Sequence, residues 1–300
     1  MARKRLVAGV SLALLVLLIT GGWWQMRAFR ARFEGRRASL DVMRRRPSDV
    51  GLAYEAFSAM NPEGTRIAGW WLPARNPIGS MVMVHGGGGN KSSMLGRAAV
   101  FVEAGVNVAV IDLRARGESG GDKSDIGPGA ALDVLAVVDA LVASGRQGRL
   151  PLLAYGLSHG ARAVVLAAAQ SPTAFSAVLA EAPPFSLRDS LKRLTGSPWV
   201  PALPEGDLPG AFATIKGHPV LLLLGDADPE ISETQGASLL SGNNNPASGV
   251  VVFEKTGHGV FGDSNLAQYR QSVGTFLTAV LAAGFRAETE RDVPDRQIVD

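Results

Sequence analysis

The chain has 300 residues, a formal net charge of +3 and no cysteine, and 46% of its residues are hydrophobic. This hydrophobic fraction supports a buried core and excludes a chain that is disordered throughout. The lack of cysteine excludes a disulfide scaffold, thiolate metal ligands and a cysteine nucleophile.

The positive charge is concentrated at the N-terminus. Residues 1–46 hold eleven Lys or Arg side chains against two acidic ones, which leaves residues 47–300 with a net charge of −6. Nucleic-acid-binding domains present a basic face to the phosphate backbone. The acidic balance of the larger part of the chain therefore argues against a nucleic-acid partner.

An uncharged stretch runs from Leu6 to Met26 between two basic clusters. As a helix it reaches about 31 Å, roughly one hydrocarbon core, and Trp23 and Trp24 stand where an aromatic belt would lie. We expect residues 1–26 to form a single-pass N-terminal membrane anchor, with a cleaved signal peptide as the alternative and the membrane side of the remaining chain open. The basic segment 27–46 is interpreted either as a juxtamembrane stretch on anionic lipid or as a solvated linker.

Short apolar runs alternate with helical patterns in the predicted main domain, residues 47–285, which precedes a tail at 286–300. Runs without polar alternation are typical of strands buried on both faces, and their alternation with helices indicates a mostly parallel sheet. The expected strands are 52–58, 65–72, 80–84, 107–111, 150–155, 176–180, 219–224 and 249–253, and the expected helices are 92–104, 130–143, 161–170 and 266–283.

Residues 156–160 match the pattern G-x-S-x-G, which places a serine nucleophile on a sharp turn between a strand and a helix. Ser158 has an expected strand before it and an expected helix after it. Residues 117–121 match the same pattern around Ser119 but lack both elements, so they are interpreted as a loop. We therefore predict Ser158 as the nucleophile.

A serine hydroxyl needs a general base and a carboxylate that orients the base. Among the four histidines, His258 is the choice, because glycines flank it and it follows the last expected strand. Asp228 is the preferred acid, with Asp226 second and Glu230 third. The chain order is then serine, aspartate, histidine.

Four consecutive glycines, residues 86–89, directly follow the expected strand 80–84. Glycine lets the backbone approach a bound group closely. We expect the backbone N–H groups of Gly87 and His159 to bind the oxyanion of a tetrahedral intermediate. A phosphate-binding loop is the alternative, but neither a G-K-[ST] sequence nor a dinucleotide pattern accompanies the glycines.

The segment 183–217 interrupts the alternation with six prolines and no strand pattern. A stretch of this length between core strands is typical of a cap or lid, and an ordinary irregular insertion is the alternative. In a cap, its apolar side chains are expected to face an acyl pocket beside the nucleophile. These side chains include Phe185, Trp199, Leu203, Leu208 and Phe212.

Five landmarks occur in order between Leu52 and Ala283. With them the chain resembles the α/β-hydrolase superfamily, and more narrowly the membrane-anchored serine hydrolases of the Bem46 type and the neighbouring esterase and prolyl-oligopeptidase-like domains. The resemblance implies an α/β-hydrolase fold, a twisted, mostly parallel sheet flanked by helices with a small cap. It departs at Ala115 and Ala161, where such proteins often have glycine. The landmarks are residues 85–90, 112–119, 156–160, 225–228 and 257–258.

These patterns predict a serine hydrolase that cleaves carboxylic esters or related acyl compounds through an acyl-Ser158 intermediate. A peptidase or amidase is the first alternative, because the same site cleaves amides. A non-catalytic binding module of the same fold is the second. The expected partner is a small-molecule substrate with no metal or cofactor, and the sequence leaves the oligomeric state open.

Overall fold

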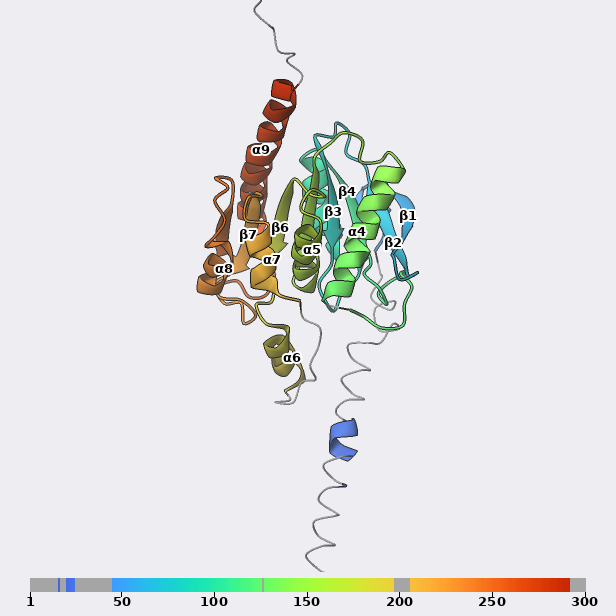
Figure 1. Cartoon of the computed structure of the whole chain (residues 1–300), viewed down its shortest axis with the longest axis vertical. Helices are drawn as coiled ribbons and strands as arrows, with labels where there is room; N and C mark the ends of the chain where they lie inside the picture. Colours follow the sequence, from blue (N-terminus) through green and yellow to red (C-terminus); the bar gives the residue numbers. More distant parts are fainter. Residues whose placement is uncertain (1–15, 17–19, 25–44, 126, 197–205, 292–300) are drawn as a thin grey trace, which may run out of the picture.

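A computed structural model describes residues 16, 20–24, 45–125, 127–196 and 206–291. Its centre is an eight-stranded sheet with the order β1-β2-β4-β3-β5-β6-β7-β8 (Figure 1). β1 and β2 are antiparallel to their neighbours, and every other pair is parallel. The strands are β1 (Glu55–Met60), β2 (Arg66–Leu72), β3 (Gly79–Val84), β4 (Val106–Ile111), β5 (Leu152–Leu157), β6 (Ala177–Glu181), β7 (Val220–Gly225) and β8 (Gly249–Phe253).

Helices cover both faces of this sheet. One hydrophobic cluster joins α4, α5, α7 and α8 to one face, and a second joins α3 and α9 to the other (Figure 1). The helices are α3 (Leu95–Glu103), α4 (Pro128–Ala143), α5 (His159–Gln170), α6 (Leu187–Thr195), α7 (Leu208–Thr214), α8 (Glu233–Leu240) and α9 (Leu266–Arg291), with short 3₁₀ helices η1 (Pro47–Val50), η2 (Lys91–Met94) and η3 (Asp263–Asn265).

The central strands are apolar throughout because both of their faces are covered. Every residue of β3, β4 and β7 is buried. The segments that follow β3, β5, β7 and β8 leave from the same, carboxyl edge of the sheet, where α/β proteins bind their ligands. His85, Ser158, Asp226 and His258 lie on these four segments.

The structure confirms a mostly parallel sheet covered by helices on both sides. The strand before Ser158 was expected at 150–155 and lies at 152–157, and α5 begins at His159 rather than at 161. The chain therefore passes from strand to helix through Ser158 alone. α9 continues to Arg291, so the first residues of the expected tail 286–300 are helical. Residues 292–300 lie outside the described part.

The predicted membrane anchor, residues 1–26, lies outside the described residues except for Val16 and Thr20–Trp24, which are helical. Trp23 and Trp24 are exposed, and their rings meet edge to face with centroids 6.4 Å apart. None of the helices in the described part of the chain combines the length and the apolar character that a membrane crossing requires.

Candidate active site

Ser158 lies on the turn that joins β5 to α5. Its backbone has φ 54° and ψ −118°, a conformation that L-residues rarely adopt and that strains the turn. Glycine is required on both sides, since a Cβ on Gly156 would lie 2.2 Å from the carbonyl oxygen of Gly160. A Cβ on Gly160 would lie 2.5 Å from the carbonyl oxygens of Val84 and His85. This tight packing holds the Ser158 side chain at the carboxyl edge of the sheet.

A chain of hydrogen bonds runs from Ser158 through His258 to Asp228. The Nε2 atom of His258 is 2.8 Å from Oγ of Ser158, and its Nδ1 atom is 3.0 Å from both carboxylate oxygens of Asp228. The Asp228 side chain is fully buried, whereas the His258 side chain keeps about a third of its surface exposed (32%). Hydroxyl, imidazole and carboxylate in this order form the arrangement with which serine hydrolases activate their nucleophile.

The two other candidate acids bind elsewhere. Both carboxylate oxygens of Asp226 accept backbone N–H groups, from Lys255 and Thr256, each at 2.9 Å. Glu230 forms an ion pair with Arg193 at 2.8 Å. The structure therefore places Asp228, and neither Asp226 nor Glu230, in hydrogen-bond contact with His258.

The environment of His258 shifts its titration. Burial lowers the pKa of the imidazole, but the hydrogen bond and negative charge of Asp228, together with the charges of Glu230 and Glu181, outweigh burial, so the pKa of His258 lies above its usual value. Raising the pKa makes Nε2 a stronger base. This favours transfer of a proton from Ser158 to His258.

The glycine-rich loop at residues 86–89 lies directly against the turn at Ser158. A Cβ on Gly86 would lie 3.4 Å from Cβ of Ser158, and one on Gly87 would lie 1.8 Å from Nδ1 of His159. His159 is the first residue of α5, a position whose N–H has no acceptor within the helix. The structure thus brings together the two residues expected to supply the oxyanion donors.

Among the described residues, none of the other three histidine side chains is hydrogen-bonded to Ser158, His258 or Asp228. His85 is fully buried, with Nδ1 2.7 Å from the carbonyl oxygen of Gly86 and Nε2 accepting the N–H of Leu113 at 3.2 Å. The ring of His159 is also buried, and burial together with the Arg162 charge lowers its pKa to about 4, so it is neutral at pH 7. The Nε2 atom of His218 lies 2.6 Å from the carbonyl oxygen of Pro172.

The second G-x-S-x-G match is part of a buried loop. Oγ of Ser119 donates to the carbonyl oxygen of Asp112 at 2.6 Å and accepts the N–H of Ala68 at 2.8 Å. In the same loop Ala115 has φ 55°, a conformation that costs an alanine more than a glycine. The family resemblance gave glycine for this position, and the positive φ supplies the physical reason.

The described part of the predicted lid, residues 183–196 and 206–217, is bonded to the domain through Arg162 on both sides of its gap. Its described part contains α6 and α7, and Trp199 and Leu203 lie outside the described residues. The buried Arg162 donates to the carbonyl oxygens of Pro184 at 2.8 Å and Gly206 at 3.3 Å. Phe185 is half-buried and packs against the core cluster on the α4 and α5 side.

The expectation for Leu208 and Phe212 was wrong. Both were expected to face an acyl pocket beside Ser158, but both are buried in the hydrophobic cluster that contains α5. α7 presents these apolar side chains to the domain rather than to a ligand. The assignment of the rest of the segment as a cap stays a prediction.

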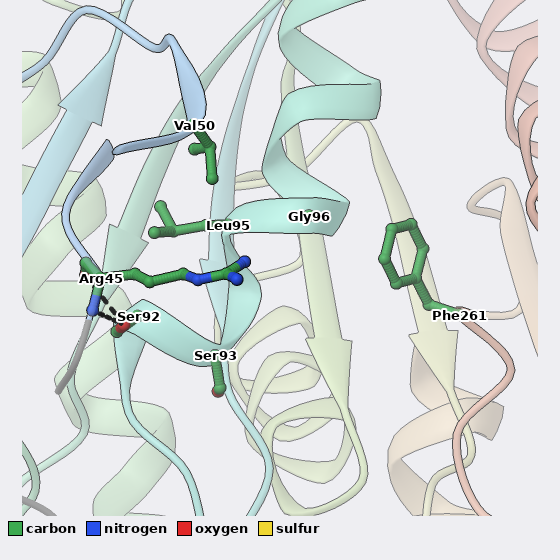
Figure 2. Close-up of a pocket in the computed structure, with 7 residues that line it drawn as sticks. All are labelled: Arg45, Val50, Ser92, Ser93, Leu95, Gly96 and Phe261. Atoms are coloured by element: carbon green, nitrogen blue, oxygen red, sulfur yellow. Dashed lines mark hydrogen bonds between the residues drawn. The ribbon is translucent and has the colours of Figure 1, made fainter. Parts of the chain in front are cut away.

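A cavity of about 400 Å³ lies beside the start of α3, and some of its lining residues are close in sequence to His258 and to the glycine-rich loop. Phe261, three residues beyond His258, forms one wall, and Ser93 forms another below the start of α3 (Figure 2). A Cβ on Gly89 of the glycine loop would lie 2.7 Å from Oγ of Ser93. The sequence did not indicate this cavity; the remaining lining residues are Arg45, Val50, Ser92, Leu95 and Gly96.

Within the described ranges, no cluster of three or more His, Cys, Asp or Glu side chains is arranged to hold a metal ion.

Fold and site together define a serine hydrolase of the α/β-hydrolase superfamily. The chain belongs to the prolyl oligopeptidase family, whose model matches residues 92–284 and so includes Ser158, Asp228 and His258. A comparison with curated protein sequences found no match. The narrower resemblance to Bem46-type hydrolases stays a prediction.

Solved structures share the fold at low sequence identity. An esterase of Pyrococcus furiosus is 20% identical, covers 79% of this chain and 96% of its own, and has a TM-score of 0.68. A dienelactone hydrolase of Anabaena variabilis is 20% identical over 76% of this chain and 98% of its own, with a TM-score of 0.59. The ferulic-acid complex of Est1E from Butyrivibrio proteoclasticus is 18% identical over 75% and 99%, with a TM-score of 0.61.

Proposed function

We propose that the protein hydrolyses carboxylic esters or related acyl compounds through an acyl-Ser158 intermediate. The observation that carries this proposal is the hydrogen-bond chain from Ser158 through His258 to Asp228. His258 Nε2 takes the hydroxyl proton as Oγ attacks the carbonyl carbon, and then returns it to the leaving alcohol. Water repeats the sequence on the acyl-enzyme and releases the acid.

Gly87 and His159 supply the oxyanion donors in this proposal. The carbonyl oxygen of the substrate becomes negatively charged in the tetrahedral intermediate, and two fixed N–H groups stabilise that charge. The close approach of Gly87 to the His159 ring supports this assignment, because it holds the glycine loop beside the turn that carries Ser158. Asp228 keeps the proton of His258 on Nδ1 and stabilises the imidazolium that forms.

The substrate is a small acyl compound bound beneath the first part of the lid. Phe185, at the start of the lid, remains a candidate for contact with the substrate, as do Trp199 and Leu203 in the adjoining segment. The presence of esterases and a dienelactone hydrolase among the structural neighbours supports an ester rather than a peptide as the substrate.

The family match favours cleavage of amides as the second candidate function. The family takes its name from an oligopeptidase, and the residues matched contain the whole proposed triad. A serine acyl-enzyme forms from amides as well as from esters, because His258 can protonate a leaving amine in the same way. The two functions therefore share the site and differ in the substrate that it accepts.

Steady-state hydrolysis separates the two candidates. We expect p-nitrophenyl acetate, butyrate and octanoate to be cleaved, and N-terminally blocked dipeptide p-nitroanilides to be cleaved at least about a hundredfold more slowly in kcat/KM. The Ser158→Ala variant, purified in parallel, controls for contaminating hydrolases. Faster cleavage of the anilides would overturn the esterase proposal in favour of the peptidase, and activity that survives in Ser158→Ala would overturn the proposed site.

We also propose that residues 1–26 anchor the protein to a membrane and that residues 27–46 contribute electrostatic attraction to anionic lipid. The uncharged stretch between basic clusters supports this proposal. The full chain is expected in the membrane fraction after alkaline carbonate extraction, with its N-terminal residues intact. Recovery in the soluble fraction with a new N-terminus after residue 26 would instead show a cleaved signal peptide.

A further inference from the structure

Glu181, the last residue of β6, carries a fully buried carboxylate next to the catalytic strand. It pairs with Leu157 of β5, the residue before Ser158. Arg97 of α3 binds the carboxylate through two hydrogen bonds, from Nε to Oε2 at 2.8 Å and from Nη2 to Oε1 at 2.6 Å. The buried hydroxyl of Tyr155 also donates to Oε2. The proposed mechanism uses none of these groups.

Glu181 makes hydrogen bonds to both catalytic segments. Its backbone carbonyl oxygen accepts the N–H of Ser158 at 2.8 Å. Its side-chain Oε1 accepts the N–H of Val260 at 2.7 Å, two residues beyond His258. One residue therefore holds the backbone of the nucleophile turn with its main chain and the backbone of the histidine loop with its carboxylate.

Arg97 reinforces the same loop from the other side. Its guanidinium lies over the Phe261 ring, 4.9 Å from the ring centroid, and the N–H of Phe261 points to Glu181 Oε1 at 3.4 Å. Guanidinium groups bind aromatic faces favourably when partly desolvated. The segment that follows His258 is thus held by a charged pair and by an aromatic contact.

The carboxylate is kept charged in this position. Burial alone would raise the pKa of Glu181, but the Arg97 guanidinium, the Tyr155 hydroxyl and the Val260 N–H together hold that pKa below its usual value. A charged acceptor binds an N–H more strongly than a neutral one does. A buried ion pair contributes little net stability compared with apolar packing of the same volume, so stability alone does not account for it.

We propose that Glu181 is a positioning residue that fixes the separation between Ser158 and His258 by holding the backbone of both segments. The proposal rests on the proposed triad and adds a residue that does not touch the substrate. Displacement of a catalytic group by about 1 Å can cost about a hundredfold in rate. Loss of the Glu181 contacts should therefore reduce kcat while substrate binding is retained.

Glu181→Gln is the test variant, because it preserves size while it removes the charge and replaces one acceptor oxygen with an NH₂ group. We expect kcat for p-nitrophenyl butyrate to fall about 10- to 100-fold with KM within about threefold, the split expected when only transition-state interactions are lost. The second-order rate of labelling by a fluorophosphonate probe, measured on the full chain, should fall in parallel, since it reports the reactivity of Ser158.

Asp133→Asn is the matched control. Asp133 on α4 is also fully buried, binds Arg114 Nη2 at 2.8 Å and accepts the N–H of Arg114 at 2.9 Å. It contacts the turn between β1 and β2 through Asn61 rather than the catalytic segments. We expect Asp133→Asn to lower the free energy of unfolding about as much as Glu181→Gln does, and to leave kcat within about twofold of the wild type.

The outcomes separate this proposal from the proposed function. If the wild type does not label, the proposed nucleophile fails and the positioning role fails with it. If the wild type labels and Glu181→Gln labels at the same rate with unchanged kcat, only the positioning role is overturned. Equal losses of kcat in Glu181→Gln and Asp133→Asn would also overturn it. If Glu181→Gln does not unfold cooperatively, Arg97→Lys, which cannot form both hydrogen bonds, replaces it with the same expected split.

Discussion

Two regions of this chain have the same spacing of glycine and serine but different surroundings. Ser158 follows a buried strand, adopts a positive φ and points its hydroxyl at His258. Ser119 lies in a loop, and its hydroxyl is engaged by two backbone groups, at Asp112 and Ala68. The spacing of glycine and serine alone therefore does not make a serine a nucleophile. The strand and helix around Ser158 expose its hydroxyl to a base, whereas the hydroxyl of Ser119 is hydrogen-bonded to the backbone of its own surroundings.

The largest expected effect separates the two serines by activity. Ser158→Ala removes the attacking oxygen, so kcat for an activated ester should fall by about three decades or more. Ser119→Ala leaves that oxygen in place and should keep kcat within about tenfold. The measurement is kcat for p-nitrophenyl butyrate with both purified variants. Comparable losses, or the reverse order, would remove the basis of the comparison.

The next effect tests the acid that orients His258. Asp228→Asn keeps the size of the side chain but favours the wrong imidazole tautomer, so kcat should fall by about two decades or more with little change in Tm. Asp226→Asn is the matched control, because Asp226 binds only the N–H groups at Lys255, Thr256 and nearby backbone. A larger loss of activity in Asp226→Asn than in Asp228→Asn would show that Asp226, and not Asp228, is the acid that orients His258.

The third expectation concerns pH. Although burial lowers the pKa of His258, Asp228 and the nearby Glu230 and Glu181 charges raise it above the usual value, and the base must be neutral to accept the Ser158 proton. Activity should therefore fall on the acid side with a midpoint above about 6.5, the ordinary value for histidine. The midpoint is read from the pH profile of kcat/KM for the wild type, and Ser119→Ala should reproduce it. A midpoint at or below 6.5 would contradict the proposed pairing.

The raised pKa of His258 also makes the free energy of unfolding depend on pH. Because the folded-state pKa of His258 is raised, its charged form is favoured by folding. The contribution to the free energy of unfolding is fully present below the unfolded-state pKa and is lost as pH rises through the folded-state pKa. His258→Gln should remove this pH dependence from denaturant titrations across neutral pH.

The smallest expected effect is a difference in stability between the variants of the two serines. Ser119→Ala leaves the N–H of Ala68 without its acceptor in a buried loop, so the free energy of unfolding should fall by about 1–3 kcal/mol. Ser158→Ala breaks a bond to a partly exposed imidazole and should change it by less. Urea titrations of the two variants make the measurement. Equal stability of Ser119→Ala and the wild type would show that its hydroxyl has no structural role.

Much of the fold could be predicted from the sequence because the central strands are uninterrupted apolar runs. The end of β5 could not, since Gly156 and Leu157 belong to the G-x-S-x-G pattern that indicated a turn, whereas the strand continues through both of them. α6, α7 and α8 were not expected, because proline, glycine and polar residues dilute their helical pattern. Leu208 and Phe212 show the same limit: an apolar residue in an insertion can pack against the domain as readily as against a ligand.

In the candidate site, too, some residues could be predicted from the sequence and others could not. Ser158 and His258 stand beside glycines at strand ends, and this local pattern was sufficient to choose them. The sequence also ranked Asp228 ahead of Asp226, but only the structure shows the contact that supports this choice, between Nδ1 of His258 and the Asp228 carboxylate. Glu181 gave no sequence signal, because an acidic residue at the end of a strand is ordinary until its burial beside Arg97 is known.

The role of Ser158 as the nucleophile is tested most directly by identifying the residue that a fluorophosphonate probe modifies. The full chain is labelled, digested and sequenced by tandem mass spectrometry, with Ser119→Ala and Ser158→Ala treated in parallel. We expect the adduct on Ser158 in the wild type and in Ser119→Ala, and no adduct in Ser158→Ala. An adduct on Ser119, or labelling that persists in Ser158→Ala, would contradict the assignment of Ser158 as the nucleophile.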